Sequence, residues 1–116
     1  MAVMYIFINN DLGMKKGKIA SQVGHVVQLI TEELVRKGYE EQPTPKSYFT
    51  YMRWKSHSKK IILKASEEEL VELIKMDGAR YIIDEGLTQI PSNSLTVVGF
   101  YPSDVLEEKF KHYKLL

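Results

Sequence analysis

The stretch of sequence that decides the fold runs from residue 3 to residue 25. It reads Val3-Met4-Tyr5-Ile6-Phe7-Ile8, then Asn9-Asn10-Asp11-Leu12-Gly13, then Met14-Lys15-Lys16-Gly17-Lys18-Ile19-Ala20-Ser21-Gln22-Val23-Gly24-His25. The first segment is apolar at every position, as in a strand buried on both faces of a sheet. The second is rich in turn-forming residues, and the third opens a long helical pattern. The stretch therefore predicts a buried strand that leads directly into a helix.

The predicted helix runs from about residue 16 to about residue 36, with Gly38 as its C-terminal cap. At about 100° per residue, Lys18, Gln22 and His25 fall within an arc of roughly 60°. The apolar residues expected to be buried on another side are Ile19, Val23, Val26, Val27, Ile30 and Leu34. A cation, an amide and an imidazole are thus expected together near a strand–helix turn, where open α/β sheets place ligands.

The rest of the chain predicts three further helices and three further strands. The helices are expected to start at a Thr44 cap followed by Pro45, at a capping box formed by Ser66 and Glu69, and at Asp104. The strands are expected over residues 60–64, 81–83 and 95–100. The order predicts an α/β fold in which a mixed four-stranded β-sheet lies in a three-layer sandwich with helices on both faces. We expect a single domain over residues 1–116.

Composition excludes several classes of chemistry. The chain has no cysteine, which rules out disulfides, thiolate catalysis and Cys-ligated zinc. The absence of cysteine agrees with a reducing compartment, and we expect the protein to lie in the cytoplasm. No apolar run approaches the ~20 residues of a membrane span, and the N-terminal residues have no signal-peptide pattern. Neither a membrane nor DNA is expected as a partner.

The net charge of +1 conceals a segregation of charge. No acidic residue occurs between Leu12 and Thr31, or between Pro43 and Ser66, and these segments hold nine of the sixteen cations. If both segments share a face, the protein has a positive patch that attracts phosphate backbones. Chance clustering on a solvated surface explains the same pattern equally well, so charge alone leaves both interpretations open.

Lysines at the start of the long helix are the first candidate site. The helix dipole disfavours cations there, so Lys16 and Lys18 indicate an anion site, or else lysines that simply reach water. His25 shares a stripe with Lys18, although a lone helical histidine is more often structural. A metal site is not expected, because the three histidines lack ligand spacing.

Two other segments carry polar groups that could converge. Asp84 follows a predicted strand and begins a run that contains Thr88 and Gln89; spacing alone favours an ordinary hairpin loop there. The segment from Arg53 to Lys60 mixes cations with Trp54. Its cations suit RNA backbone, whereas the tryptophan is expected to pack inward rather than to stack on a base.

Taken together, these segments resemble the type II peptidyl-tRNA hydrolase family. The blocks that carry the resemblance are Asp11 to His25, Asp84-Glu85-Gly86-Leu87-Thr88-Gln89-Ile90, Thr96-Val97-Val98-Gly99 and Lys114-Leu115-Leu116. They cover nearly the whole chain in order and at compatible spacing. The resemblance implies hydrolysis of the ester that joins a peptide to the terminal ribose of tRNA. It also implies a homodimer, and the reaction requires no cofactor.

Within this interpretation each candidate residue has an expected role. Asp84 orients or deprotonates water, and Lys18 stabilises the oxyanion or holds Asp84 charged. Thr88 and Gln22 position the water or the ester. The residues expected to bind the tRNA acceptor end are Lys16, His25, Gln89, Thr96, Arg53 and Lys55.

Two departures from the family pattern motivate alternatives. The family commonly has alanine and arginine where this chain has Glu85 and Leu87. A tRNA- or protein-binding module with little or no hydrolysis is therefore the second hypothesis. A small α/β domain that binds an unrelated anionic metabolite is the third.

Overall fold

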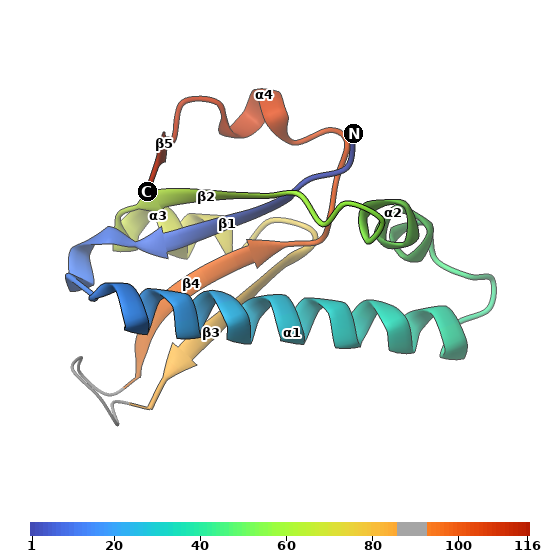
Figure 1. Ribbon diagram of the computed structural model, residues 1–116, viewed down its shortest axis with the longest axis horizontal. Coiled ribbons are helices and arrows are strands. Elements are labelled where there is room, and N and C mark those ends of the chain that lie inside the picture. Colours follow the sequence, from blue (N-terminus) through green and yellow to red (C-terminus); the bar gives the residue numbers. More distant parts are fainter. Residues whose placement is uncertain (86–92) are drawn as a thin grey trace.

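The structure, a computed structural model, describes residues 1–85 and 93–116 (Figure 1). Within these residues the chain forms one mixed five-stranded sheet in the order β3-β4-β1-β2-β5. The strands are β1 (Met4–Asn9), β2 (Lys60–Ala65), β3 (Ala79–Asp84), β4 (Ser94–Phe100) and β5 (Lys114–Leu115). The helices are α1 (Lys16–Glu40), α2 (Lys46–Trp54), α3 (Glu67–Leu73) and α4 (Glu107–Phe110), with a 3-10 turn, η1 (Asn10–Leu12).

The central strand β1 sets the direction of the sheet. All six of its residues are buried, as its uninterrupted apolar sequence predicts. It runs parallel to β2 and antiparallel to β4, and β4 is antiparallel to β3. The strands β1, β2 and β3 therefore point the same way, and their carboxyl ends meet at one edge of the sheet. The N-terminus of α1 lies at this edge (Figure 1).

Helices pack against both faces of the sheet through two apolar clusters. On one face, α1 contributes Val26, Ile30 and Leu34, and α2 contributes Tyr51 and Trp54. On the other face, α3 and the Phe110 ring of α4 pack against alternate residues of β1. The sequence lets α1 approach β4 closely at Gly99, where a Cβ atom would lie 3.0 Å from side-chain atoms of both Val26 and Ile30.

The expected fold class is correct in outline and wrong in two details. The sheet has a fifth strand, β5, because two residues near the C-terminus pair with the edge of β2. The picture of three layers around four strands is also slightly off. One face carries only α3, of seven residues, and α4, of four residues, which do not form a complete layer of helices.

Several element ends differ from their predicted positions. Helix α1 continues to Glu40 through Gly38, whose missing side chain makes room for the Tyr48 ring: a Cβ there would lie 2.2 Å from it. Helix α2 is preceded by Pro45 rather than capped by Thr44, and α4 begins at Glu107 rather than at Asp104. The capping box is confirmed, with both of its hydrogen bonds formed between Ser66 and Glu69. The inward packing of Trp54 is confirmed as well, since it is buried.

Candidate active site

The turn between β1 and α1 fixes the helix at the carboxyl edge of the sheet. Asn9, which is buried, accepts a hydrogen bond from the backbone N–H of Asp11 and donates one to the carbonyl of Leu95, at 2.9 and 2.8 Å. Gly13 has a φ of 60°, a left-handed conformation that glycine adopts without strain. The chain can thus reverse direction within a few residues, and Lys18 comes to lie one helical turn from the edge.

An ion pair between Lys18 and Asp84 is the centre of the candidate site. The lysine Nζ lies 2.5 Å from the Asp84 Oδ1, and the two side chains are only 8% and 11% exposed. They come from the first turn of α1 and the last residue of β3. Because water is largely excluded from the pair, its electrostatic attraction is stronger than at a surface, and so is its desolvation penalty. A buried ion pair of this kind is weak evidence for stability and a common feature of functional sites.

Gln22 follows one turn after Lys18 and is held by a buried hydrogen bond. Its Oε1 lies 2.6 Å from the hydroxyl oxygen of Thr96 in β4. The Thr96 hydroxyl also lies 3.3 Å from the carbonyl oxygen of Ile82; because it has one proton, we assign the donation to the nearer Gln22 oxygen. Thr96 therefore fixes the orientation of the amide. The nitrogen of Gln22 is turned away from Thr96 and can donate to a ligand.

A small pocket opens beside these groups. Its volume is ≈ 250 Å³, and its lining residues are Gln22, His25, Ile82, Ile83, Asp84 and Glu85. Two larger hollows, of ≈ 310 and ≈ 860 Å³, lie beside α3. The larger of them is walled by glutamates of α3, which repel an anionic substrate. We take the smaller pocket as the candidate site because it contains Asp84 of the ion pair and Gln22.

The structure brings together three of the four residues expected to be catalytic, Lys18, Gln22 and Asp84. The fourth, Thr88, lies outside the described residues, as does Gln89. Thr96 is fully buried behind Gln22, where it contacts the amide rather than a substrate. The catalytic roles remain predictions, whereas the convergence of the side chains is a property of the fold.

The residues expected to bind tRNA lie in two places. Lys16 is exposed at the start of α1, and His25 lines the pocket with its Nε2 3.4 Å from the Ser21 hydroxyl. Arg53 and Lys55 lie in and just after α2, near the opposite end of α1 (Figure 1). The Arg53 guanidinium is paired with Asp104 at 2.8 Å, and this hydrogen bond raises its pKa further.

Ile82 and Ile83 also line the pocket, although they are not among the residues expected at the site. The sequence does indicate their position, because they directly precede Asp84 in a predicted strand. Neighbouring residues of a strand point to opposite faces of the sheet, so the two side chains lie on both faces next to Asp84. Within residues 1–85 and 93–116, no group of three His, Cys, Asp or Glu side chains is arranged to hold a metal ion.

Comparison with known proteins shows the family of the chain. A family model described as peptidyl-tRNA hydrolase PTH2 matches residues 2–116. The peptidyl-tRNA hydrolase of Methanococcus vannielii is 35% identical over 119 residues, covering 96% of this chain and 96% of the relative. The probable peptidyl-tRNA hydrolase 2 of Dictyostelium discoideum is 36% identical over 119 residues, covering 95% of this chain and 52% of the relative. The mitochondrial peptidyl-tRNA hydrolase 2 of Homo sapiens is 32% identical over 121 residues, covering 97% and 63%. The chain therefore belongs to the peptidyl-tRNA hydrolase PTH2 family.

Proposed function

We propose that this protein hydrolyses the ester bond between the peptide and the terminal ribose of peptidyl-tRNA, which releases the peptide and recycles the tRNA. The observation that carries the proposal is the buried Lys18–Asp84 ion pair beside a pocket, in a chain whose family membership spans residues 2–116. An ester is already activated relative to an amide. One positioned water is therefore sufficient as the nucleophile.

Asp84 is the proposed partner of that water. Its carboxylate orients the molecule and accepts a proton as the water oxygen attacks the ester carbonyl carbon. The bond between the carbonyl carbon and the ribose oxygen then breaks, and that oxygen leaves with the proton that Asp84 accepted. Lys18 has two compatible roles: it keeps Asp84 ionised, and its ammonium stabilises the negative charge that develops on the carbonyl oxygen. Loss of one such donor costs about 10²–10³ in rate in other enzymes.

Gln22 is the proposed positioning group for the ester or the water. Its amide oxygen accepts from Thr96, so its nitrogen is held ready to donate into the pocket. Preorganised donors of this kind need no rearrangement during the reaction. Thr96 acts through Gln22, and we propose it as a positioning residue rather than a direct contact. Thr88 stays a proposed partner of the same water.

Binding of the acceptor end is the proposed role of the outer residues. His25 lines the pocket, Lys16 is the first residue of α1, and Gln89 follows Thr88 in the sequence. Arg53 and Lys55 lie farther along the molecule, where they would contact the RNA backbone. Of these, Arg53 is expected to contribute least, because Asp104 already neutralises its charge.

Assembly and compartment are part of the proposal too. The resemblance to the family implies a homodimer, and the absence of cysteine agrees with a reducing compartment such as the cytoplasm. The human relative is named as a mitochondrial protein. Among the described helices, none combines the length and the apolar character that crossing a bilayer requires.

Release of N-blocked aminoacyl groups from tRNA tests the proposal. We expect rapid release by the wild type and loss of about 10²–10³ in rate for both Lys18→Ala and Asp84→Asn. Circular dichroism and a melting curve check that the variants remain folded. If the wild type releases nothing under conditions where tRNA still binds, the protein is a binding module on this fold, and Leu87→Arg is the first variant to examine.

A further inference from the structure

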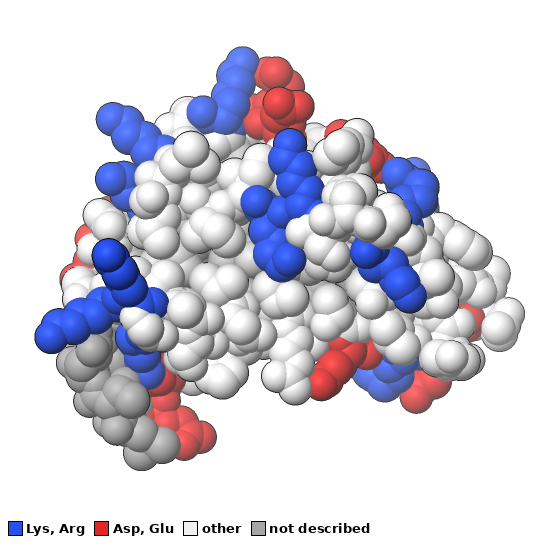
Figure 2. All heavy atoms as spheres, in the orientation of Figure 1, with Lys and Arg blue, Asp and Glu red and all other residues white. Residues whose placement is uncertain are grey.

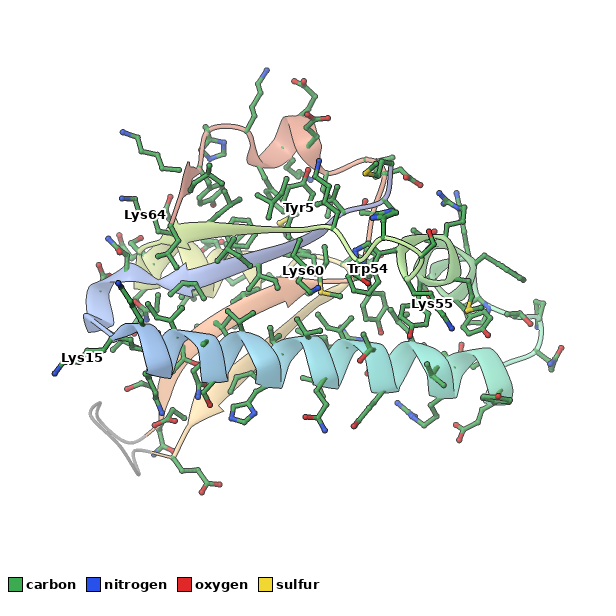
Figure 3. The ribbon with its side chains drawn as sticks, viewed as in Figure 1. Tyr5, Lys15, Trp54, Lys55, Lys60 and Lys64 are labelled. Carbon is green, nitrogen blue, oxygen red and sulfur yellow. The ribbon has the colours of Figure 1, made fainter. Side chains whose placement is uncertain are left out.

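Four exposed lysines follow the β2 side of the sheet, outside the candidate active site. We define Lys55, Lys60, Lys64 and Lys114 as the lysine row. Figure 3 shows Lys64, Lys60 and Lys55 in succession from the end of the sheet near Lys15 to the end of α2. Figure 2 shows that uncharged surface separates the cations on this side of the molecule.

The alternation of β2 places the row on the same face of the sheet as α1. Ile62 packs into the apolar cluster that contains α1, and residues two apart in a strand share a face. Lys60 and Lys64, which flank Ile62, therefore point to this face. Helix α1 packs mainly over β3 and β4, so β2 keeps both lysines exposed. Lys114 joins them because it lies directly opposite Lys64 in the β2–β5 ladder.

The row carries positive charge that the described part of the chain does not balance. No ion pair there includes Lys55, Lys60, Lys64 or Lys114. By contrast, Lys75 and Lys111 each pair with a glutamate three residues earlier, at 3.1 and 2.7 Å. Two lysines opposite each other in neighbouring strands repel and destabilise a sheet. An anionic ligand would reduce this repulsion. The Lys60 ammonium is also held in place, 5.2 Å from the centre of the Trp54 ring.

The length of the row distinguishes a polymer from a single phosphate group. Lys60 and Lys64 are four residues apart, and a strand rises by about 3.3 Å per residue, so their Cα atoms lie about 13 Å apart. Strand side chains stand roughly perpendicular to the sheet, and the Lys60 ammonium is held at Trp54, so one phosphate does not contact both ammonium groups. Several phosphates of an RNA backbone can contact both, and each lysine that neutralises one releases a counterion.

We infer that the lysine row binds the phosphate backbone of the tRNA acceptor stem, which lies along β2 from the carboxyl edge of the sheet toward α2. This inference rests on the proposed function. The Lys64 end of the row lies at the edge where Lys18 and Asp84 meet. The single-stranded end of the tRNA then crosses the first turn of α1, which carries Lys16, to bring its ester to the pocket. Helix α3 packs on the opposite face through Leu70 and Leu73, and its Glu69 lines a hollow with Lys64 and Lys114 at the edge of the sheet.

The test compares two double variants on two substrates. Lys60→Gln/Lys64→Gln removes the centre of the row, and Lys75→Gln/Lys111→Gln removes two exposed lysines elsewhere as the matched control. The substrates are N-acetyl-aminoacyl-tRNA and the same N-acetyl-aminoacyl group on a CCA trinucleotide, which has no stem. KM, kcat and the salt dependence of tRNA binding are measured for each protein.

We expect the row variant to raise KM for the tRNA several-fold with kcat retained, and to lower the salt slope of binding by about two units, roughly one per lysine. The control variant should match the wild type, and all three proteins should cleave the trinucleotide substrate alike. Equal salt slopes for the two double variants would overturn the inference, as would an equal loss on the trinucleotide. If the wild type cleaves neither substrate but tRNA binding still depends on the row, the inference stands and the hydrolase proposal fails.

Discussion

Two ion pairs connect the same helix to the same strand, at opposite ends of each. Lys18 of α1 pairs with Asp84 at the end of β3, and Glu33 of α1 pairs with Arg80 near its beginning. The surroundings of the two pairs differ. Around Glu33, the Tyr101 hydroxyl donates to the same carboxylate oxygen as Arg80, whose guanidinium also donates to Tyr101. Around Asp84, a pocket opens toward solvent.

We propose that the Glu33–Arg80 pair stabilises the fold and that the Lys18–Asp84 pair serves the chemistry. Burial alone would raise the pKa of the Glu33 carboxyl, but the hydrogen bonds from Tyr101 and Arg80 and nearby positive charges lower it overall. Burial and the hydrogen bond to Glu33 raise the pKa of Tyr101 well above its usual range. In this cluster the carboxylate, the guanidinium and the hydroxyl are hydrogen-bonded to one another. The Lys18–Asp84 pair is less exposed and faces a pocket, which a purely structural pair does not need.

The largest expected effect separates the two pairs by activity. Lys18→Met should lower kcat for N-acetyl-aminoacyl-tRNA by about 10²–10³, because it removes the proposed oxyanion donor. Arg80→Met removes the cation of the other ion pair between α1 and β3, and it should leave kcat near the wild-type value. The two variants are compared by their single-turnover rates, measured at a temperature where both are folded. Similar losses in the two variants would contradict it.

A double substitution sharpens the comparison by separating stability from activity. Lys18→Met alone removes the ammonium group from the buried Asp84 carboxylate, which costs about 3–5 kcal/mol of folding free energy. Lys18→Met/Asp84→Leu should recover most of that loss, because apolar residues often replace a buried ion pair without penalty. It should recover none of the activity. Urea denaturation and the tRNA assay measure the two quantities, and recovery of activity in the double variant would exclude both residues from catalysis.

Thr96→Val tests the support behind the catalytic pair. It leaves the Gln22 oxygen buried without its donor, which costs about 1–3 kcal/mol of stability. We expect kcat to fall several-fold while KM changes little, because the Gln22 amide loses its fixed orientation. Thr96→Ser keeps the hydroxyl and should restore kcat. A Thr96→Val enzyme with wild-type kcat would show that this hydrogen bond serves the core alone.

Glu33→Gln gives the smallest expected effect and concerns pH. The folded pKa of Glu33 lies below its unfolded value of about 4.3, so ionised Glu33 stabilises the protein above that pH. This contribution is lost as the pH falls through the lowered folded pKa. We expect the variant to lose about 1 kcal/mol at neutral pH and to show a flatter fall of Tm below pH 4–5. If Tm falls at low pH in the variant as it does in the wild type, other carboxyl groups dominate the acid destabilisation.

The sequence predicted the features that local patterns determine. The apolar run from Val3 to Ile8 identified the central strand, and the Ser66–Glu69 spacing identified the start of α3. Helical periodicity placed Lys18 and Gln22 on one side of α1, and the structure brings them to the same site. In each case the spacing of residues along the chain is enough to predict the feature, without knowledge of the tertiary structure.

Features that depend on distant contacts were missed. Strand β5 is two residues long and forms because β2 has an open edge. Gly38 resembles a helix cap, but Tyr48 packs against it and the helix continues. The cluster of Glu33, Arg80 and Tyr101 joins three separate segments, and no spacing along the chain relates them. Strand alternation predicts that Lys60 and Lys64 share a face of the sheet. The exposure of these two side chains, by contrast, depends on where α1 packs.

The most direct test of the central claim is the rate of N-acetyl-aminoacyl release by Asp84→Asn and by Glu33→Gln, measured side by side on folded protein. Both substitutions neutralise a carboxylate that joins α1 to β3. We expect Asp84→Asn to lose about 10²–10³ in rate, the scale of removing one oxyanion-hole donor, and Glu33→Gln to remain close to the wild type. Equal losses, or a greater loss in Glu33→Gln, would show that the Lys18–Asp84 pair is a structural contact and that the catalytic groups lie elsewhere.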